Sequence, residues 1–117
     1  MKKILVVDDD TLIAMATAEL IAEFGYSTLE ANSPDQALGI LTSEPGIALM
    51  ITDYAMPGMT GIDLAAAAAA IRPSLHILLA TGYADLPDGI TTQLPRVAKP
   101  FDERELRARI ATLLGGA

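Results

Sequence analysis

Carboxylate, hydroxyl and ammonium side chains follow short apolar runs at several places in this sequence. The polar residues at these places are Asp8, Asp9, Asp10, Asp53, Thr81 and Lys99. Carboxylates gathered at one place repel each other unless they share a cation, and Mg²⁺ prefers oxygen ligands of this kind. A lysine ammonium and a threonine hydroxyl would add hydrogen-bond donors for phosphoryl oxygens. A fold that brings these residues together would be suited to phosphoryl transfer.

The apolar runs that precede these residues have the pattern of buried strands. Ile4 to Val7, Ile47 to Thr52 and Leu75 to Ala80 are rich in apolar residues, which is typical of strands buried on both faces. Ser27 to Ala31 and Arg96 to Ala98 are shorter strand candidates. We therefore predict five strands.

Helical patterns separate the first three strands. The first helix is expected over Thr11 to Phe24, followed by Gly25 as a stop, and its predicted apolar stripe consists of Leu12, Ala16, Leu20 and Phe24. Ser33, Pro34 and Gln36 predict the N-cap, first-turn proline and capping box of a second helix that ends near Ser43. The alanine run from Ala65 to Ala70 favours a third helix.

The C-terminal part is less regular. The segment from Gly82 to Pro95 contains three Gly or Pro breakers after Gly82 and little helical periodicity, so the helix after the fourth strand is expected to be short or missing. A capping box over 102–105 predicts the last helix, with its inner face formed by Leu106, Ile110 and Leu113.

Strands that alternate with helices predict an α/β fold, a three-layer sandwich with a parallel sheet and right-handed crossovers. In such sheets, ligands bind outside the carboxyl ends of the strands. The polar residues named above are therefore expected to meet at one edge. The chain has room for one hydrophobic core, so we predict a single domain over residues 1–117.

Composition excludes several function classes. Eight basic and fifteen acidic residues give a net charge of −7, which disfavours direct binding of nucleic acid. The longest purely apolar stretch, Leu64 to Ile71, has eight residues, whereas a membrane span needs about twenty. The chain has no Cys and no signal-peptide pattern. We therefore expect a cytoplasmic protein without a membrane association.

Four motifs carry a family resemblance. They are Val6 to Asp9, Asp53 with Met56, Pro57, Gly58 and Gly61, Ala80 to Gly82, and Lys99 to Phe101. Through these motifs the whole chain resembles the receiver domains of two-component response regulators. The resemblance implies a flavodoxin-like fold with five parallel strands in the order 2-1-3-4-5.

The resemblance also implies roles for individual residues. Asp53 would be the phosphoacceptor, and Thr81 and Lys99 would bind the phosphoryl group. Mg²⁺ would be the cofactor, and its ligands would be Asp8, Asp9, Asp53 and the backbone carbonyl of Ala55. The Lys99–Pro100 peptide would be cis. The expected partner is a sensor histidine kinase or a histidine phosphotransfer protein, and the expected activity is Mg²⁺-dependent self-phosphorylation and dephosphorylation rather than enzymatic turnover.

Two features depart from the common family pattern. Arg96 stands three residues before Lys99, where many receivers have a Tyr or Phe that serves as a rotameric switch. The Ala80 to Tyr83 string resembles the Ala-Thr-Gly-Tyr motif of some single-domain and hybrid-kinase receivers. We therefore predict that Tyr83 is the switch residue, and that the segment from Gly82 to Pro95 gains order on activation.

Two other functions stay open at this point. Asp8 and Asp10 lie two residues apart, which also suits the nucleophile and acid of a small Mg²⁺-dependent aspartyl-phosphate phosphatase. A receiver-like binding module that is never phosphorylated is the second alternative. A flavin carrier is excluded, because three negative charges stand where its phosphate-binding loop would have to be.

Overall fold

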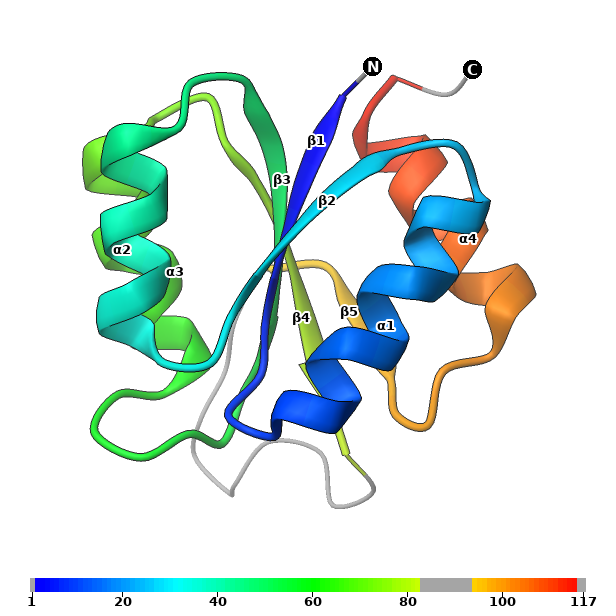
Figure 1. Ribbon diagram of the computed structural model, residues 1–117, viewed down its shortest axis with the longest axis horizontal. Helices are drawn as coiled ribbons and strands as arrows, with labels where there is room; N and C mark the ends of the chain where they lie inside the picture. Colours follow the sequence, from blue (N-terminus) through cyan, green and yellow to red (C-terminus); the bar gives the residue numbers. More distant parts are fainter. Residues whose placement is uncertain (1, 83–93, 116–117) are drawn as a thin grey trace.

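The computed structural model describes residues 2–82 and 94–115, and in these residues strands and helices alternate (Figure 1). The elements are β1 (Lys3–Val7), α1 (Thr11–Glu23), β2 (Ser27–Ala31), α2 (Pro34–Ser43), β3 (Ile47–Asp53), α3 (Gly61–Ile71), β4 (His76–Thr81), β5 (Arg96–Ala98) and α4 (Glu103–Leu113). The five predicted strands are confirmed, with bounds that differ by one residue at β1, β3 and β4. Tyr83, and with it the question of a helix after β4, lies outside the described residues.

The sheet has the strand order β2-β1-β3-β4-β5, and all four pairs of neighbouring strands are parallel. The predicted flavodoxin-like order is therefore confirmed. Because every strand runs in the same direction, all carboxyl ends lie at one edge of the sheet, at the bottom of Figure 1.

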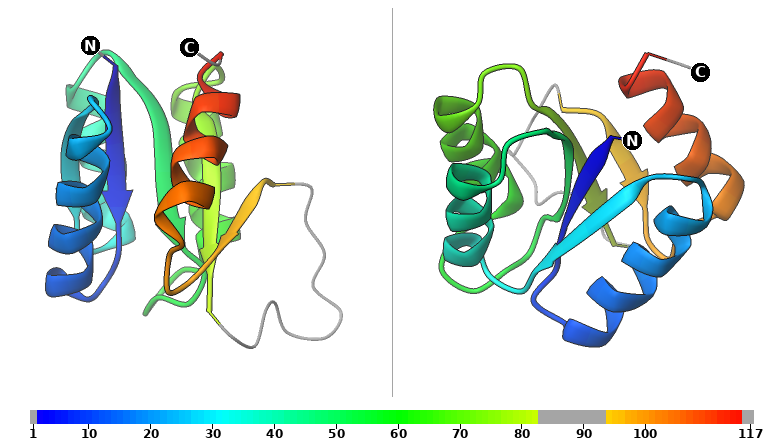
Figure 2. Two further views of the ribbon diagram at one scale, coloured as in Figure 1. Left: turned by 90° about the vertical axis from the view of Figure 1, so that its right-hand side faces the viewer. Right: turned by 45° about the horizontal axis from the view of Figure 1, so that its top comes forward.

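Helices cover both faces of the sheet, as Figures 1 and 2 show: α1 and α4 lie on one face, and α2 and α3 on the other. Strand β1 explains the two cores, because successive side chains point to opposite faces. Ile4 and Val6 pack with α1 and α4, whereas Leu5 and Val7 pack with α2 and α3. The predicted three-layer sandwich is confirmed.

The buried face of α1 differs from the predicted stripe. Leu12 is 74% exposed, Ala16 is also exposed, and Leu20 and Phe24 are only partly buried. The residues that face the sheet are instead Ala14, Thr17, Ala18 and Ile21. A strict spacing of four drifts around a helix of 3.6 residues per turn, whereas the observed spacing of three and four stays on one side. The predicted stripe is therefore wrong at Leu12 and Ala16, whereas Leu20 and Phe24 pack against the core.

Side-chain caps fix the starts of the helices. Ser33 accepts a hydrogen bond from the Gln36 N–H at the start of α2, as predicted. The Gln36 side chain, however, accepts from the N–H of Asn32 at 2.8 Å, one residue before the predicted capping-box partner. Thr60 and Asp63 form a complete capping box at the start of α3. Within the described residues, no helix is both long and apolar enough to cross a membrane.

Candidate functional site

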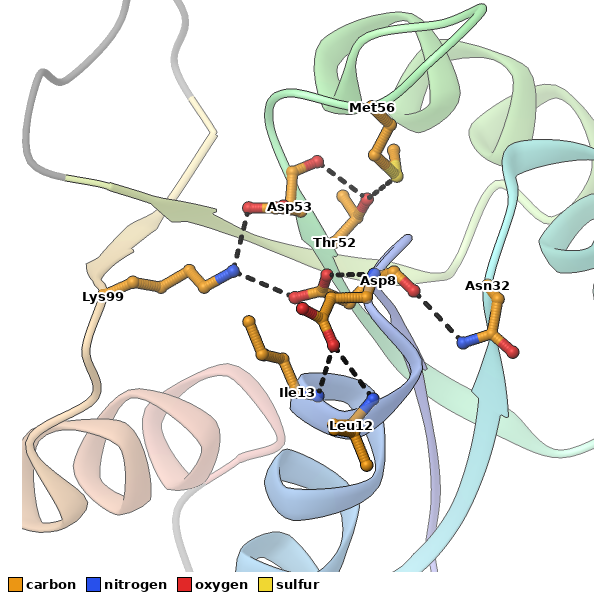
Figure 3. Close-up of polar contacts among 9 residues, drawn as sticks. Asp8, Leu12, Ile13, Asn32, Thr52, Asp53, Met56 and Lys99 are labelled. Carbon is orange, nitrogen blue, oxygen red and sulfur yellow. Dashed lines mark hydrogen bonds and ion pairs between the residues drawn. The ribbon is translucent and has the colours of Figure 1, made fainter.

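Three strands bring charged side chains together at the carboxyl edge of the sheet (Figure 3). Asp8 follows β1, Asp53 ends β3, and Lys99 follows β5. The Lys99 Nζ atom lies 2.9 Å from Asp8 Oδ2 and 3.2 Å from Asp53 Oδ1. One ammonium group therefore joins two carboxylates that are 45 residues apart in the sequence.

An acidic cluster surrounds this ion pair. Asp8, Asp9 and Asp53 each offer one carboxylate oxygen, and these atoms lie within 4.8 Å of one another. Asp8 is buried and Asp53 is partly buried, whereas Asp9 is exposed. Three carboxylate oxygens at this spacing form a hard donor set that fits a magnesium ion. Asp10 takes another role, because its side chain caps α1 by accepting from the N–H groups of Leu12 and Ile13.

The Asp8 side chain is held at both of its oxygen atoms. Oδ1 accepts from the Asp10 N–H at 2.9 Å, and Oδ2 accepts from Lys99. Only 5% of Asp8 is exposed, so these bonds compensate for its burial. Its orientation is therefore fixed by the main chain and by Lys99.

The main chain of Asp53 is enclosed by its neighbours. The hydroxyl of Thr52, which is fully buried, donates to the Asp53 carbonyl oxygen at 3.1 Å. Gly61, the first residue of α3, lies against the same carbonyl group, and a Cβ atom at Gly61 would overlap it. The Gly61 N–H donates to the Tyr54 carbonyl at 2.7 Å. The start of α3 thus sets where β3 ends.

Burial and charge act in opposite directions on the ionisation of the site. Burial raises the pKa of Asp53, the charge and hydrogen bond of Lys99 lower it, and the charges of Asp8 and Asp9 raise it, with a net increase. Burial lowers the pKa of Lys99, whereas its hydrogen bond to Asp8 and the charges of Asp53 and Asp8 raise it. Together these interactions outweigh burial, so the net shift is upward. Lys99 is therefore a fixed positive charge at neutral pH, and it is the main electrostatic support of the Asp53 carboxylate.

The remaining predicted residues are less directly connected. Thr81 ends β4 and is buried, and its carbonyl accepts from the Lys99 N–H at 2.8 Å. Among the described residues, no hydrogen bond joins the Thr81 hydroxyl to Asp53 or Lys99. Ala55 lies on an exposed loop after β3, and the role of its carbonyl stays a prediction. The Lys99–Pro100 peptide is cis, as the resemblance implied.

Comparison with protein families decides the identity of the fold. Residues 4–111 match the model of the response regulator receiver domain. The chain belongs to the receiver domain family. This receiver domain is 33% identical to the response regulator receiver protein CpdR of Brucella abortus (strain 2308), over 97% of this chain and 98% of CpdR. It is 34% identical to sporulation initiation phosphotransferase F of Bacillus subtilis (strain 168), over 97% and 94% of the two chains.

Solved structures agree with the family. A response regulator receiver domain protein from Clostridium thermocellum superimposes with a TM-score of 0.90 at 28% identity, over 98% of this chain and 95% of that chain. The predicted membership of the receiver domain family is therefore confirmed, and the chain is a CheY-like receiver domain of two-component response regulators.

Sequence analysis of this receiver domain missed two polar residues beside the site. Thr52 precedes Asp53 and was included only as the end of a strand. Asn32 directly follows β2, and its side-chain amide donates to the Asp8 carbonyl at 3.2 Å. The rule that ligands bind outside the carboxyl ends of parallel strands could have found Asn32, because β2 also ends at the functional edge.

Proposed function

We propose that this receiver domain accepts a phosphoryl group onto Asp53 from a phosphohistidine of a sensor histidine kinase or a histidine phosphotransfer protein. The observation that carries the proposal is the Lys99 ammonium, which lies between the carboxylates of Asp8 and Asp53 beside a third carboxylate. Such a site offers a nucleophile, a fixed positive charge and a set of metal ligands within a few ångströms.

In the proposed reaction, a carboxylate oxygen of Asp53 attacks the phosphorus atom in line. The bond from phosphorus to the imidazole nitrogen breaks, and its electron pair stays on the imidazole of the partner. No base from this chain is required, because the nucleophile is the ionised carboxylate. The Lys99 ammonium and the Thr81 hydroxyl would then donate to phosphoryl oxygens.

Magnesium would be held by Asp8, Asp9, Asp53 and the backbone carbonyl of Ala55. When bound, it supplies positive charge that neutralises the phosphoryl oxygens and the neighbouring carboxylates. The donor set supports this assignment, because all three side chains offer oxygen atoms. We propose that the chain catalyses only its own phosphorylation and dephosphorylation.

Incubation with acetyl phosphate and Mg²⁺ tests the proposal, with intact-mass analysis as the readout. We expect one phosphoryl adduct that hydroxylamine removes and that maps to Asp53. Asp53→Asn should carry no adduct, because its amide keeps the shape of the side chain and lacks the nucleophilic charge. Asp35→Asn is the matched control, since Asp35 is an exposed acid in the first turn of α2, and it should be modified like wild type.

The two alternative functions give different results in the same assay. Phosphate released over many turnovers from excess donor supports an aspartyl-phosphate phosphatase. A protein that binds Mg²⁺ and never carries the adduct supports a binding module. Equal modification of wild type and Asp53→Asn refutes the assignment of the phosphoacceptor.

We also propose that this chain is similar in type to the single-domain and hybrid-kinase receivers. The Ala-Thr-Gly-Tyr string at 80–83 supports this. So does the match to CpdR, of which the chain covers 98%. Phosphotransfer from a panel of purified kinases and phosphotransfer proteins tests it. Rapid transfer from a phosphotransfer protein or hybrid kinase is the expected result, and transfer only from the kinase of a DNA-binding regulator contradicts it.

A further inference from the structure

Asp9 is the least restrained carboxylate of the acidic cluster. Lys99 holds the side chains of Asp8 and Asp53, whereas within residues 2–82 and 94–115 no hydrogen bond or ion pair restrains the Asp9 side chain. Asp9 is also exposed. Its direction therefore depends on the main chain that carries it, which is the peptide group between Asp8 and Asp9.

Asn32 holds that peptide group from the neighbouring strand (Figure 3). The last backbone bond between β1 and the end of β2 runs from the Asp8 N–H to the Ala31 carbonyl at 3.1 Å. The Asn32 Nδ2 atom continues this ladder by one more bond, to the Asp8 carbonyl at 3.2 Å. A carbonyl oxygen only accepts, so the amide nitrogen of Asn32 is the atom that can face it.

The position of Asn32 is itself fixed by α2. Its N–H donates to the Gln36 side chain at 2.8 Å, and the Gln36 N–H donates to Ser33 Oγ at 3.1 Å. The side-chain amide of Asn32 is therefore presented to Asp8 by a turn that is closed by two hydrogen bonds. The first turn of α2 is thus connected to the acidic cluster through the Asn32 side chain.

We propose that Asn32 is a positioning residue of the metal site. Its amide fixes the direction of the Asp8 carbonyl, and because the peptide group is planar, it also fixes where the Asp9 Cα atom lies. The Asp9 carboxylate then stays within 4.8 Å of those of Asp8 and Asp53. Asn32 does not bind the metal itself. The inference rests on the proposed divalent-cation site.

Titration with Mn²⁺, followed by the electron paramagnetic resonance signal of the free ion, tests this role. Asn32→Ala should weaken Mn²⁺ binding about tenfold, the lower end of the range for residues that orient metal ligands. In the Asp9→Ala background the same substitution should change the affinity less than about twofold, because residues that act through one another are not additive. Equal effects in both backgrounds would overturn the proposed path through Asp9.

Ser33→Ala is the matched control for the turn. It removes the N-cap of α2 and weakens the same turn, but it keeps the bonds from Asn32 to Gln36 and to Asp8, so its Mn²⁺ affinity should fall less than that of Asn32→Ala. An equal loss in Ser33→Ala and Asn32→Ala would refute the role of the amide. Thermal unfolding without metal shows whether each variant is folded.

A spectroscopic readout does not depend on affinity. In metal-free protein, the backbone amide signal of Asp9 should shift in Asn32→Ala, because the preceding carbonyl loses its hydrogen bond. It should shift less in Ser33→Ala, which keeps that bond. An unmoved Asp9 signal in Asn32→Ala refutes the proposal. The outcomes separate the two hypotheses: wild type that binds no Mn²⁺ refutes the metal site, whereas wild type and Asn32→Ala with equal affinity refute only the role of Asn32.

Discussion

Substitution of Gly61 by alanine should destabilise this receiver domain and displace its proposed phosphoacceptor. Gly61 begins α3, and an added Cβ atom would overlap the Asp53 carbonyl oxygen and lie 2.8 Å from Leu79 Cδ1. Ordinary contacts between carbon atoms are about 3.5–4.0 Å. The first of these neighbours is main chain at the end of a buried strand, so it cannot rotate away as a flexible side chain could.

Three contributions determine the expected loss in the free energy of unfolding of Gly61→Ala. Overpacking costs about 1–3 kcal/mol, and weakening the 2.7 Å bond from the Gly61 N–H to Tyr54 costs about 1 kcal/mol. In the opposite direction, alanine raises the free energy of unfolding by about 0.5–1 kcal/mol, because it is less flexible than glycine in the unfolded chain. The sum is a destabilisation of about 1–3.5 kcal/mol, against the 5–15 kcal/mol that is typical of a domain.

Urea denaturation followed by circular dichroism measures the effect, with Gly39→Ala as the matched control. Gly39 is an exposed residue inside α2, and a Cβ atom there would meet nothing within 4 Å. Gly39→Ala should therefore stabilise the domain by about 0.5–1 kcal/mol. The two substitutions are chemically identical and should have opposite signs. A neutral or stabilising Gly61→Ala would show that the contact with Asp53 does not restrict this position.

Three further predictions concern the charged groups. The folded-state pKa of Asp53 is raised, so its ionisation destabilises the fold, and Asp53→Asn should be more stable than wild type at pH 7. This difference in stability should disappear as the pH falls below the ordinary pKa of an aspartate. Thermal unfolding in metal-free buffer at several pH values checks this prediction. Lys99→Met should lose about 1–3 kcal/mol at pH 7, since two carboxylates lose their hydrogen-bond partner. That loss should shrink in acid, as urea titrations at pH 7 and pH 4 would show, and a loss independent of pH contradicts it. Arg72→Met should lose about 1–3 kcal/mol by urea denaturation, because Arg72 Nη2 donates to the carbonyls of Leu41 and Glu44 at 2.7 and 3.0 Å.

Hydrophobic pattern predicted the strands and their end points well, and the reason is the parallel sheet. A strand buried on both faces is a continuous apolar run, and a charged residue marks where it leaves the core. Asp8 and Asp53 both follow such runs. Strand order is different, because the same alternation of elements is compatible with several orders. The resemblance to receiver domains supplied the order that the structure shows.

The pattern was less informative where small or polar residues decide the packing. The first helix buries Ala14 and Thr17 beside Ile21 and exposes Leu12, so large apolar side chains alone do not mark its inner face. Small residues such as Ala14 and Ala18 let the helix lie close to the sheet, and they fill part of the contact that a count of large apolar residues would miss. Hydrogen bonds between distant segments, such as the bond from Asn32 to Asp8, leave no periodic signal in the sequence.

The charge balance of the site connects its stability to its proposed chemistry. When ionised, Asp8, Asp9 and Asp53 carry three negative charges, and Lys99 contributes one positive charge, so the group carries two net negative charges. A monovalent cation would neutralise half of this charge, whereas Mg²⁺ would neutralise all of it. Burial is the main cause of the raised pKa of Asp53, and repulsion from Asp8 and Asp9 adds to it. That repulsion also favours the binding of a divalent ion. An ion that binds only the folded chain stabilises it, so Mg²⁺ should raise the melting temperature of wild type more than that of Asp53→Asn. Equal shifts of the melting temperature would show that the Asp53 charge does not contribute to metal binding.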